Sequence, residues 1–158
     1  MAHFPVNHPA RPLYRVFAGL VGVYILLFGV WGVAETWGDP LFDRGNHWVL
    51  GLRTNLGFSL VSVIFGVVLI IGASRRSNLG HHMNLTAGVV FMVTGVAMMC
   101  VLQTSANFLN FSMSTVIVSL LFGLLLLATG LYDKIGTDEH AEREKANRRH
   151  PVSEAGTR

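Results

Sequence analysis

The chain has 158 residues, of which 51% are hydrophobic and only 13% are charged, and its formal net charge is +3. About 25% of the residues of a soluble domain are charged, and the mean hydropathy here is +0.49. These values exclude an ordinary soluble domain and indicate an integral membrane protein. The basic residues flank hydrophobic stretches, where they set membrane topology, so the positive charge does not indicate a nucleic-acid partner.

Four hydrophobic stretches follow one another along the chain. A helix needs about 20 residues to cross a hydrocarbon core of about 30 Å, and each stretch is long enough. The sequence therefore predicts an all-α fold, an integral membrane four-helix bundle between two polar tails, the second of them disordered. The membrane domain is residues 13–134, with spans at 13–34, 54–74, 83–102 and 108–132, and the tails are residues 1–12 and 135–158.

The distribution of basic residues predicts the orientation. All twelve lysines and arginines except Arg44 and Arg53 fall on one side of the predicted bundle. Because cytoplasmic loops carry an excess of these residues, we expect both termini in the cytoplasm and the connection 35–53 outside. Within that connection, Asp39 and Pro40 are typical of an N-cap and a first helical residue, which predicts a short helix in the membrane interface.

A weak internal repeat suggests that the spans form two similar helical hairpins. The hexapeptide Val61–Gly66 in the second span matches Val118–Gly123 in the fourth. Shorter echoes relate 52–54 to 102–104, and 58–60 to 111–113. The alternative is that leucine, valine, serine and glycine recur in any membrane helix.

Small residues in the spans, three pairs of them four residues apart, predict close helix packing. Lipid is as apolar as leucine, so membrane helices associate through close backbone approach and a few hydrogen bonds. A role as hinges, or as the lining of a pathway, is the alternative. The candidate packing residues are Ala18, Gly22, Ser62, Gly66, Gly88, Gly95, Ser119 and Gly123.

The spans contain no aspartate, glutamate, lysine, arginine or histidine near their middle. Proton relays, ion-coupled transporters and histidine-ligated haems need such residues there. We therefore predict no catalytic, cofactor or metal site and no enzymatic activity. His81 and His82 are expected to be solvated, because adjacent helical residues point about 100° apart and seldom bind one ion together. Cys100 is expected to be buried as a small hydrophobe.

Polar residues gather at the predicted outer ends of the spans. They suggest a shallow polar pocket or a docking patch for a partner or a lipid headgroup. The alternative is that they cap helix ends and form interhelical hydrogen bonds. Asn107 and Asn110 are three residues apart and are expected to share a helical face. The candidate outer cluster is Glu35, Arg53, Asn55, Gln103, Asn107 and Asn110.

At the other end of the spans, basic residues are candidate contacts for anionic lipids. Their role in setting the topology also accounts for them. These candidates are Arg75, Arg76 and Lys134.

The chain resembles a family of small four-span membrane proteins, mostly actinobacterial, that is grouped as a domain of unknown function. The resemblance covers about residues 12–136 and implies a bacterial cytoplasmic membrane, but no reaction or cofactor. The segments that carry it are 50–56 leading into 58–62, 81–85, and 106–112 leading into the fourth span.

Three functions are open at this stage. The leading hypothesis is a non-enzymatic accessory or scaffolding subunit that packs against other membrane protein subunits or against itself; it predicts a glycine-rich face that the chain's own helices leave unfilled. The alternative is a small-molecule or lipid-binding membrane protein, with a redox-linked role as one form, that uses the outer polar cluster. A small transporter or channel comes third.

Overall fold

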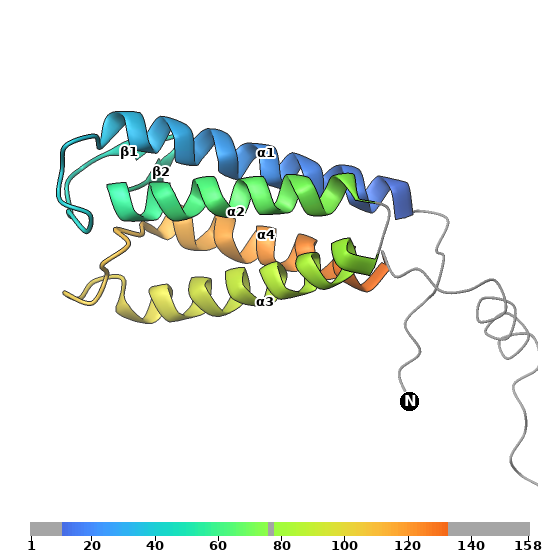
Figure 1. The fold of residues 1–158 in the computed structure, drawn as a ribbon. Coiled ribbons are helices and arrows are strands. Elements are labelled where there is room, and N and C mark those ends of the chain that lie inside the picture. Colours follow the sequence, from blue (N-terminus) through green and yellow to red (C-terminus); the bar gives the residue numbers. More distant parts are fainter. Residues whose placement is uncertain (1–10, 76–77, 133–158) are drawn as a thin grey trace, which may run out of the picture.

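The computed structural model describes residues 11–75 and 78–132. Within these ranges the fold is all-α apart from one small β-hairpin, and each of its four helices is long and apolar enough to cross a membrane, which confirms the predicted fold class. Figure 1 shows the helices side by side along one direction. The elements are α1 (Arg11–Glu35), β1 (Trp48–Val49), β2 (Leu52–Arg53), α2 (Leu56–Ser74), α3 (Asn78–Val101) and α4 (Met113–Tyr132).

The connections α1–α2 and α3–α4 lie at one end of the bundle, called here the loop end. Arg11, Ser74 and Tyr132 lie at the opposite end, called here the tail end (Figure 1). The predicted disordered tail 135–158 and all but the last two residues of the predicted tail 1–12 lie outside the described residues.

Two helix starts differ from the predicted ones. α3 begins five residues before the predicted start of the third span at residue 83, and therefore includes His81 and His82. α4 begins only at Met113, because Asn110 has a φ of +55° and breaks the helical path. Asn107 and Asn110 accordingly lie in a loop and share no helical face, so that expectation was wrong.

The short interfacial helix expected after Asp39 is also absent from the described connection. Trp48–Val49 pairs instead with Leu52–Arg53 as an antiparallel hairpin. The two turn residues, Leu50 and Gly51, have φ values of +50° and +80°, the pattern of the tight turns that join antiparallel strands. The β-branched and aromatic residues beside Gly51 carried this signal in the sequence.

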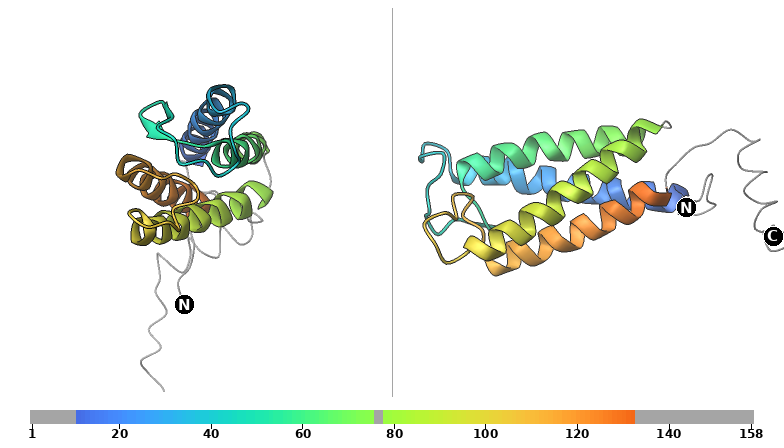
Figure 2. Two further views of the ribbon diagram at one scale, coloured as in Figure 1. Left: turned by 90° about the vertical axis from the view of Figure 1, so that its left-hand side faces the viewer. Right: turned by 90° about the horizontal axis from the view of Figure 1, so that it is seen from below.

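The four helices form two hairpins, each of which is packed much more closely within itself than against the other. α1 lies along α2 and α3 lies along α4, with lesser contacts between α1 and α4 and between α2 and α3. Figure 2 shows both hairpins from the loop end and from the side, where α2 and α3 diverge toward the loop end.

Glycines make the close packing within each hairpin possible. A Cβ atom on Gly66 would lie 2.6 Å from the backbone nitrogen of Leu26 in α1. Similarly, a Cβ atom on Gly123 would lie 2.9 Å from the backbone nitrogen of Met92 in α3. A side chain at either position would force the helix backbones apart. Gly22, Gly88 and Gly95, also predicted as packing residues, meet the partner helix of their own hairpin.

The two hairpins repeat the same contacts at matching positions. The two hairpins are compared by aligning Val61–Gly66 with Val118–Gly123 and Gly22 with Gly88. In this alignment, the contact of Gly66 with Leu26 corresponds to the contact of Gly123 with Met92. Gly22 against Ile70 corresponds to Gly88 against Leu127. The hydrogen-bond pattern repeats as well: Arg15 donates to the carbonyl oxygen of Ala73, and His81 Nδ1 donates to that of Gly130, the matching position.

The repeated contacts support the alignment of Val61–Gly66 with Val118–Gly123. The two shorter sequence matches, 52–54 with 102–104 and 58–60 with 111–113, do not fit this alignment. Parallel repeats of this kind are related by an axis along the membrane normal, as in several transporters. The buried leucines Leu69 and Leu126, both 0% exposed, occupy matching positions of α2 and α4. Each hairpin therefore supplies an equivalent half of the core.

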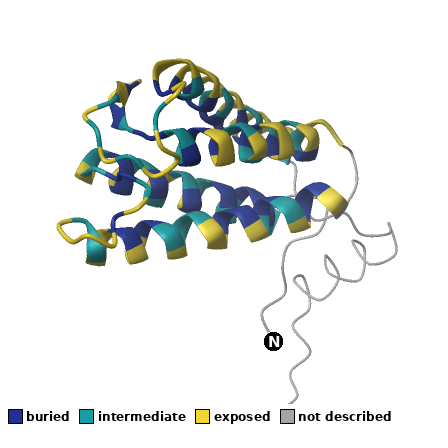
Figure 3. Ribbon diagram, turned by 60° about the vertical axis from the view of Figure 1, so that its left-hand side comes forward, coloured by how far each residue is buried: buried dark blue, intermediate teal, exposed yellow. Residues whose placement is uncertain are grey.

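The outward faces of the helices are apolar and exposed, as lipid-facing surfaces must be. Figure 3 shows exposed residues along the outside of the helices and buried ones between them. Ile64, Val93 and Leu124 are among these exposed residues.

Asn84 breaks the repeat. It is 0% exposed, and within residues 11–75 and 78–132 neither its side-chain nitrogen nor its oxygen has a hydrogen-bond partner. Its matching residue in α1 is Ala18, also 0% exposed. A buried amide without partners costs about 1–3 kcal/mol. We therefore expect Asn84→Ala to raise the thermal unfolding temperature in detergent, whereas Ala18→Asn should lower it. A fall in stability with Asn84→Ala would mean that the amide is partnered.

Candidate functional site: a cavity beneath an asparagine network

Asn55 caps α2 and joins both connections at the loop end. It is 0% exposed, and its side-chain oxygen accepts a hydrogen bond from the backbone N–H of Phe58 at 2.8 Å. Its side-chain nitrogen donates to the carbonyl oxygens of Asp43 and Phe108, at 3.2 and 2.7 Å. One side chain therefore serves as an N-cap and as a bridge between the two loops.

Asn110 makes a second bridge between the loops. Its side-chain nitrogen donates to the carbonyl oxygens of Gly45 and Thr54, both at 2.9 Å. Asparagine tolerates its positive φ better than most residues. Asn107 folds its own loop, since its nitrogen donates to Leu102 and Phe111 and its oxygen accepts from the N–H of Phe111.

The other members of the predicted outer cluster are more scattered. Glu35 is exposed and accepts a hydrogen bond from the indole of Trp31. Arg53 is half-buried and donates to the carbonyl oxygen of Gly45 at 3.0 Å, while Gln103 is exposed on the second loop. The structure thus brings together Asn55, Asn110 and Arg53, which all bind backbone of the first connection.

The asparagine amides are therefore occupied by backbone groups of the chain itself. A buried polar group with its partners in place is structural in the first instance. The side chains of Asn55, Asn107, Asn110 and Arg53 form a polar layer at the loop end, called here the roof, and a cavity lies beneath it.

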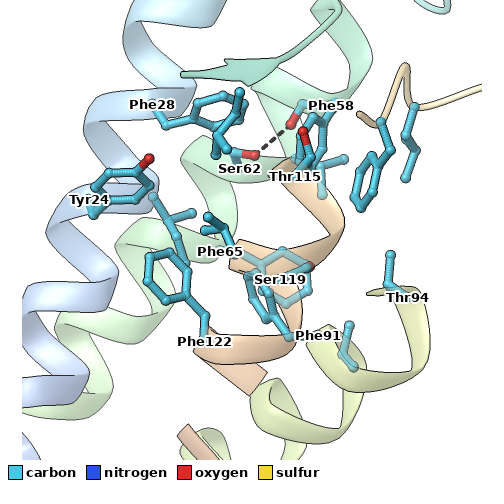
Figure 4. A pocket seen from close by; sticks show the side chains of 17 residues that line it. Tyr24, Phe28, Phe58, Ser62, Phe65, Phe91, Thr94, Thr115, Ser119 and Phe122 are labelled. Carbon is cyan, nitrogen blue, oxygen red and sulfur yellow. Dashed lines mark hydrogen bonds between the residues drawn. The ribbon is translucent and has the colours of Figure 1, made fainter. Parts of the chain in front are cut away.

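A cavity of about 150 Å³ lies between the two hairpins, next to the roof. Its walls are almost entirely apolar and aromatic, with hydroxyl groups from a few serines and threonines (Figure 4). One of these, Ser62, donates its hydroxyl to the carbonyl oxygen of Phe58. The cavity is lined by Tyr24, Ile25, Phe28, Leu52, Phe58, Val61, Ser62, Phe65, Val90, Phe91, Thr94, Leu109, Phe111, Thr115, Val118, Ser119 and Phe122.

The cavity lies on the axis that relates the hairpins. All its lining residues except Phe111 fall into pairs at matching positions, for example Ser62 with Ser119 and Phe65 with Phe122. Aromatic pairs join the hairpins below it: Phe65 meets Phe91 edge-on at 5.9 Å, and Tyr24 meets Phe122 at 5.3 Å. The packing residues Ser62 and Ser119 thus also line the cavity.

The β-hairpin closes one side of this cavity. It packs on α1 and α4, with Val49 and Leu52 buried against Phe28. Hydrogen bonds from both helices hold its turn. The hydroxyl of Tyr24 in α1 donates to the carbonyl oxygen of Leu50, and the hydroxyl of Ser114 in α4 donates to the carbonyl oxygen of Gly51.

The opposite side, between α2 and α3, is more open. Val61 of α2 and Val90 of α3 line the cavity and are 46% and 38% exposed. Their matching residues on the α4 and α1 side, Val118 and Tyr24, are less exposed. The cavity therefore faces the lipid region through the gap between α2 and α3.

At the tail end, an open hollow is lined by Arg11, Pro12, Arg15, Val16, Ala73 and Ser74, and Arg15 donates there to the carbonyl oxygen of Ala73. Arg75 is exposed and ends α2, whereas Arg76 and Lys134, the other predicted lipid contacts, lie outside the described residues. His82 is exposed as expected, but His81 is only 8% exposed and bonds to Gly130, so its expected solvation was wrong. Cys100, expected to be buried, is exposed.

Sequence reasoning did not find the cavity. Its lining looks like ordinary membrane-helix sequence. The aromatic residues Tyr24, Phe28, Phe65, Phe91 and Phe122 at inward positions were the available signal, and they are equally typical of a filled core.

Comparison with curated proteins and with solved structures finds no match. A family pattern does match, over residues 15–132, which includes α1 from Arg15 onward, the other three helices, the roof and the cavity. The chain therefore belongs to the family described as Domain of unknown function (DUF4383).

Proposed function

We propose that this protein binds a small apolar, ring-bearing molecule between its two helical hairpins. The observation that carries the proposal is the aromatic cavity of about 150 Å³ on the repeat axis. An apolar cavity of about this size stays dry and holds a benzene-sized ring in other proteins. Binding sites are typically concave, mostly apolar and provided with a few polar groups, and this cavity has that composition.

The ligand would enter from the bilayer. Val61 and Val90 are exposed at the gap between α2 and α3, while the β-hairpin covers the opposite side. A ring could occupy the cavity while an attached apolar chain stays in the lipid. We propose a binding role without catalysis, because the lining residues offer hydroxyl groups but no general acid, base or nucleophile pair.

The orientation follows from the charge distribution. We propose that the tail end faces the cytoplasm and the loop end lies outside a bacterial cytoplasmic membrane, because most basic residues belong to the tail side. The ligand site would then lie in the outer half of the bilayer.

An accessory-subunit role has less support. That hypothesis expects a glycine face left unfilled, but Gly22, Gly66, Gly88, Gly95 and Gly123 all meet helices of their own chain. The amides of the outer asparagines are occupied by backbone groups as well, so these three residues are not available to bind a partner.

The variant Thr94→Phe tests the proposal. It places in the cavity the ring that Phe28 carries at the matching position, and so fills the space. We expect toluene or indole to raise the unfolding temperature of the purified wild-type protein, since a ligand at 100 times its Kd stabilises by about 2.7 kcal/mol. Thr94→Phe should abolish this shift while leaving the protein folded.

The matched control is Val93→Phe. Val93 is adjacent in α3 and 61% exposed on the lipid-facing side, so its ring adds apolar area without entering the cavity. The ligand shift should persist in this variant. An equal shift in all three proteins would show that the probes act through the detergent, and it would remove the support for a cavity site.

A further inference from the structure

A cluster of three side chains with metal-ligating groups lies in the first connection, outside the membrane helices. Oxygen atoms of Asp39 and Asp43 and a ring nitrogen of His47 all lie within 4.8 Å of one another. His47 Nε2 is 3.2 Å from Asp39 Oδ2. Three ligands on a tetrahedral zinc ion, at bond lengths of about 2.0–2.2 Å, are about 3.3–3.5 Å apart. Small side-chain movements would therefore bring all three onto one ion.

The charges at this position are unbalanced. Within the described residues, neither Asp39 nor Asp43 pairs with a lysine or arginine. Arg53 is near but donates to the carbonyl oxygen of Gly45, and Arg44 is exposed. Two carboxylates this close repel each other unless a proton or a cation lies between them.

Gly45 leaves the space that such an ion would need. A Cβ atom on this residue would lie 2.5 Å from Asp43 Oδ2 and 2.8 Å from His47 Nε2, between two of the three ligand groups. Its backbone N–H donates to Asp43 Oδ2 at 2.8 Å and so fixes that carboxylate. Gly45 does not have a positive φ, so the backbone conformation does not by itself require a glycine here.

The loop that carries the three groups is held by the asparagine roof. The side-chain nitrogen of Asn55 donates to the carbonyl oxygen of Asp43, and that of Asn110 donates to the carbonyl oxygen of Gly45. The backbone N–H of Thr54 donates to the carbonyl oxygen of His47. The backbone at two of the ligand residues and at the glycine between them is thus fixed by groups from outside the loop. A backbone fixed in this way limits the positions that the ligand side chains can take, which favours a preorganised site.

We infer that Asp39, Asp43 and His47 form a binding site for a divalent transition-metal ion of the zinc type. One imidazole and two carboxylates suit such a metal, and three protein ligands leave a fourth position for water or another group. This site is separate from the membrane cavity and does not depend on the proposed apolar ligand.

The test is Zn²⁺ binding to the full-length protein, purified with a tag free of histidine, stripped of metal and placed in lipid nanodiscs. Isothermal titration calorimetry should find one tight Zn²⁺ ion per chain. His47→Gln and Gly45→Ala should each weaken that binding by at least about 10-fold, because one removes a ligand and the other blocks the space between ligands. The control His82→Ala removes an exposed histidine of α3 and should leave the affinity unchanged.

Gly45→Ala makes the test decisive, since it keeps all three ligand groups. Folding of each variant is checked by size-exclusion chromatography and circular dichroism, with Asp43→Asn as the replacement should His47→Gln fail to fold. The inference is overturned if the wild type binds no Zn²⁺, or if the wild type and Gly45→Ala bind it equally. The Asp39–His47 pair would then be only a loop contact.

Discussion

Gly66→Ala is expected to lower the stability of the protein strongly, and much more than Gly19→Ala, the same change elsewhere in the first hairpin. The new Cβ would lie 2.6 Å from the backbone nitrogen of Leu26 and 2.7 Å from its Cα. Backbone cannot rotate away as a side chain can, so α1 and α2 must separate. Overpacking typically costs about 1–3 kcal/mol, and a backbone clash at the centre of the hairpin belongs at the upper end of that range.

The matched control is Gly19→Ala, in which the new Cβ meets only Ala73 Cβ at 3.7 Å, an ordinary contact. Unfolding temperatures in one detergent should therefore fall clearly for Gly66→Ala and little for Gly19→Ala. The repeat adds a further expectation, because Gly123→Ala should behave like Gly66→Ala. Equal effects of the Gly19 and Gly66 variants would contradict the packing described here.

Asn55→Ala is expected to have the second large effect. It removes the α2 cap, worth about 1 kcal/mol, and leaves the carbonyl oxygens of Asp43 and Phe108 without their donor. Each buried unsatisfied group adds about 1–3 kcal/mol. These contributions add up to at least about 3 kcal/mol, the lower end applying because both hydrogen bonds are only partly buried. The loss is measured by unfolding in a series of denaturant concentrations.

Asn55→Asp separates the two roles of this side chain. The carboxylate keeps the acceptor for the N–H of Phe58 but cannot donate to either loop. If bridging the loops matters most, Asn55→Asp should be at least as destabilising as Asn55→Ala. The control Asn46→Ala, at an exposed loop position, should change stability by less than about 0.5 kcal/mol. If both Asn55 variants change stability only slightly, the structural role of this side chain is contradicted, and the hypothesis of a polar pocket at the asparagines regains support.

The membrane class and the number of helices could be predicted from the sequence, because hydrophobic length is a direct physical requirement for crossing a bilayer. The packing glycines also stood out, since close approach between membrane helices needs small residues. Their partners did not: whether Gly66 faces α1, a neighbouring protein or lipid depends on how the helices are arranged.

The loop end could be predicted less well, because local signals compete there. Asp39–Pro40 is typical of a helix start, yet Leu50 and Gly51 form a strand turn, and tertiary contacts with α1 and α4 favour the hairpin. Asn107 and Asn110 have the spacing of a helical face, but their side chains bind backbone groups in a loop. Such side-chain-to-backbone bonds compete with helix formation, and only the structure shows which arrangement is adopted.

The cavity and the candidate metal site both depend on contacts between segments far apart in the sequence. Tyr24, Phe65, Phe91 and Phe122 come from four different helices. Asp39, Asp43 and His47 are close in sequence, but their convergence depends on a loop that Asn55 and Asn110 hold from outside. Neither arrangement has a sequence pattern of its own.

The most direct test of the proposed binding role is mass spectrometry of small molecules retained by the protein. The wild type, Thr94→Phe and Val93→Phe should each be extracted from the native membrane in polymer-bounded lipid discs, without detergent. The cavity predicts one apolar, ring-bearing compound in near-stoichiometric amount with the wild type and with Val93→Phe, and its loss from Thr94→Phe. The same bulk phospholipids with all three proteins, and nothing else, would contradict it.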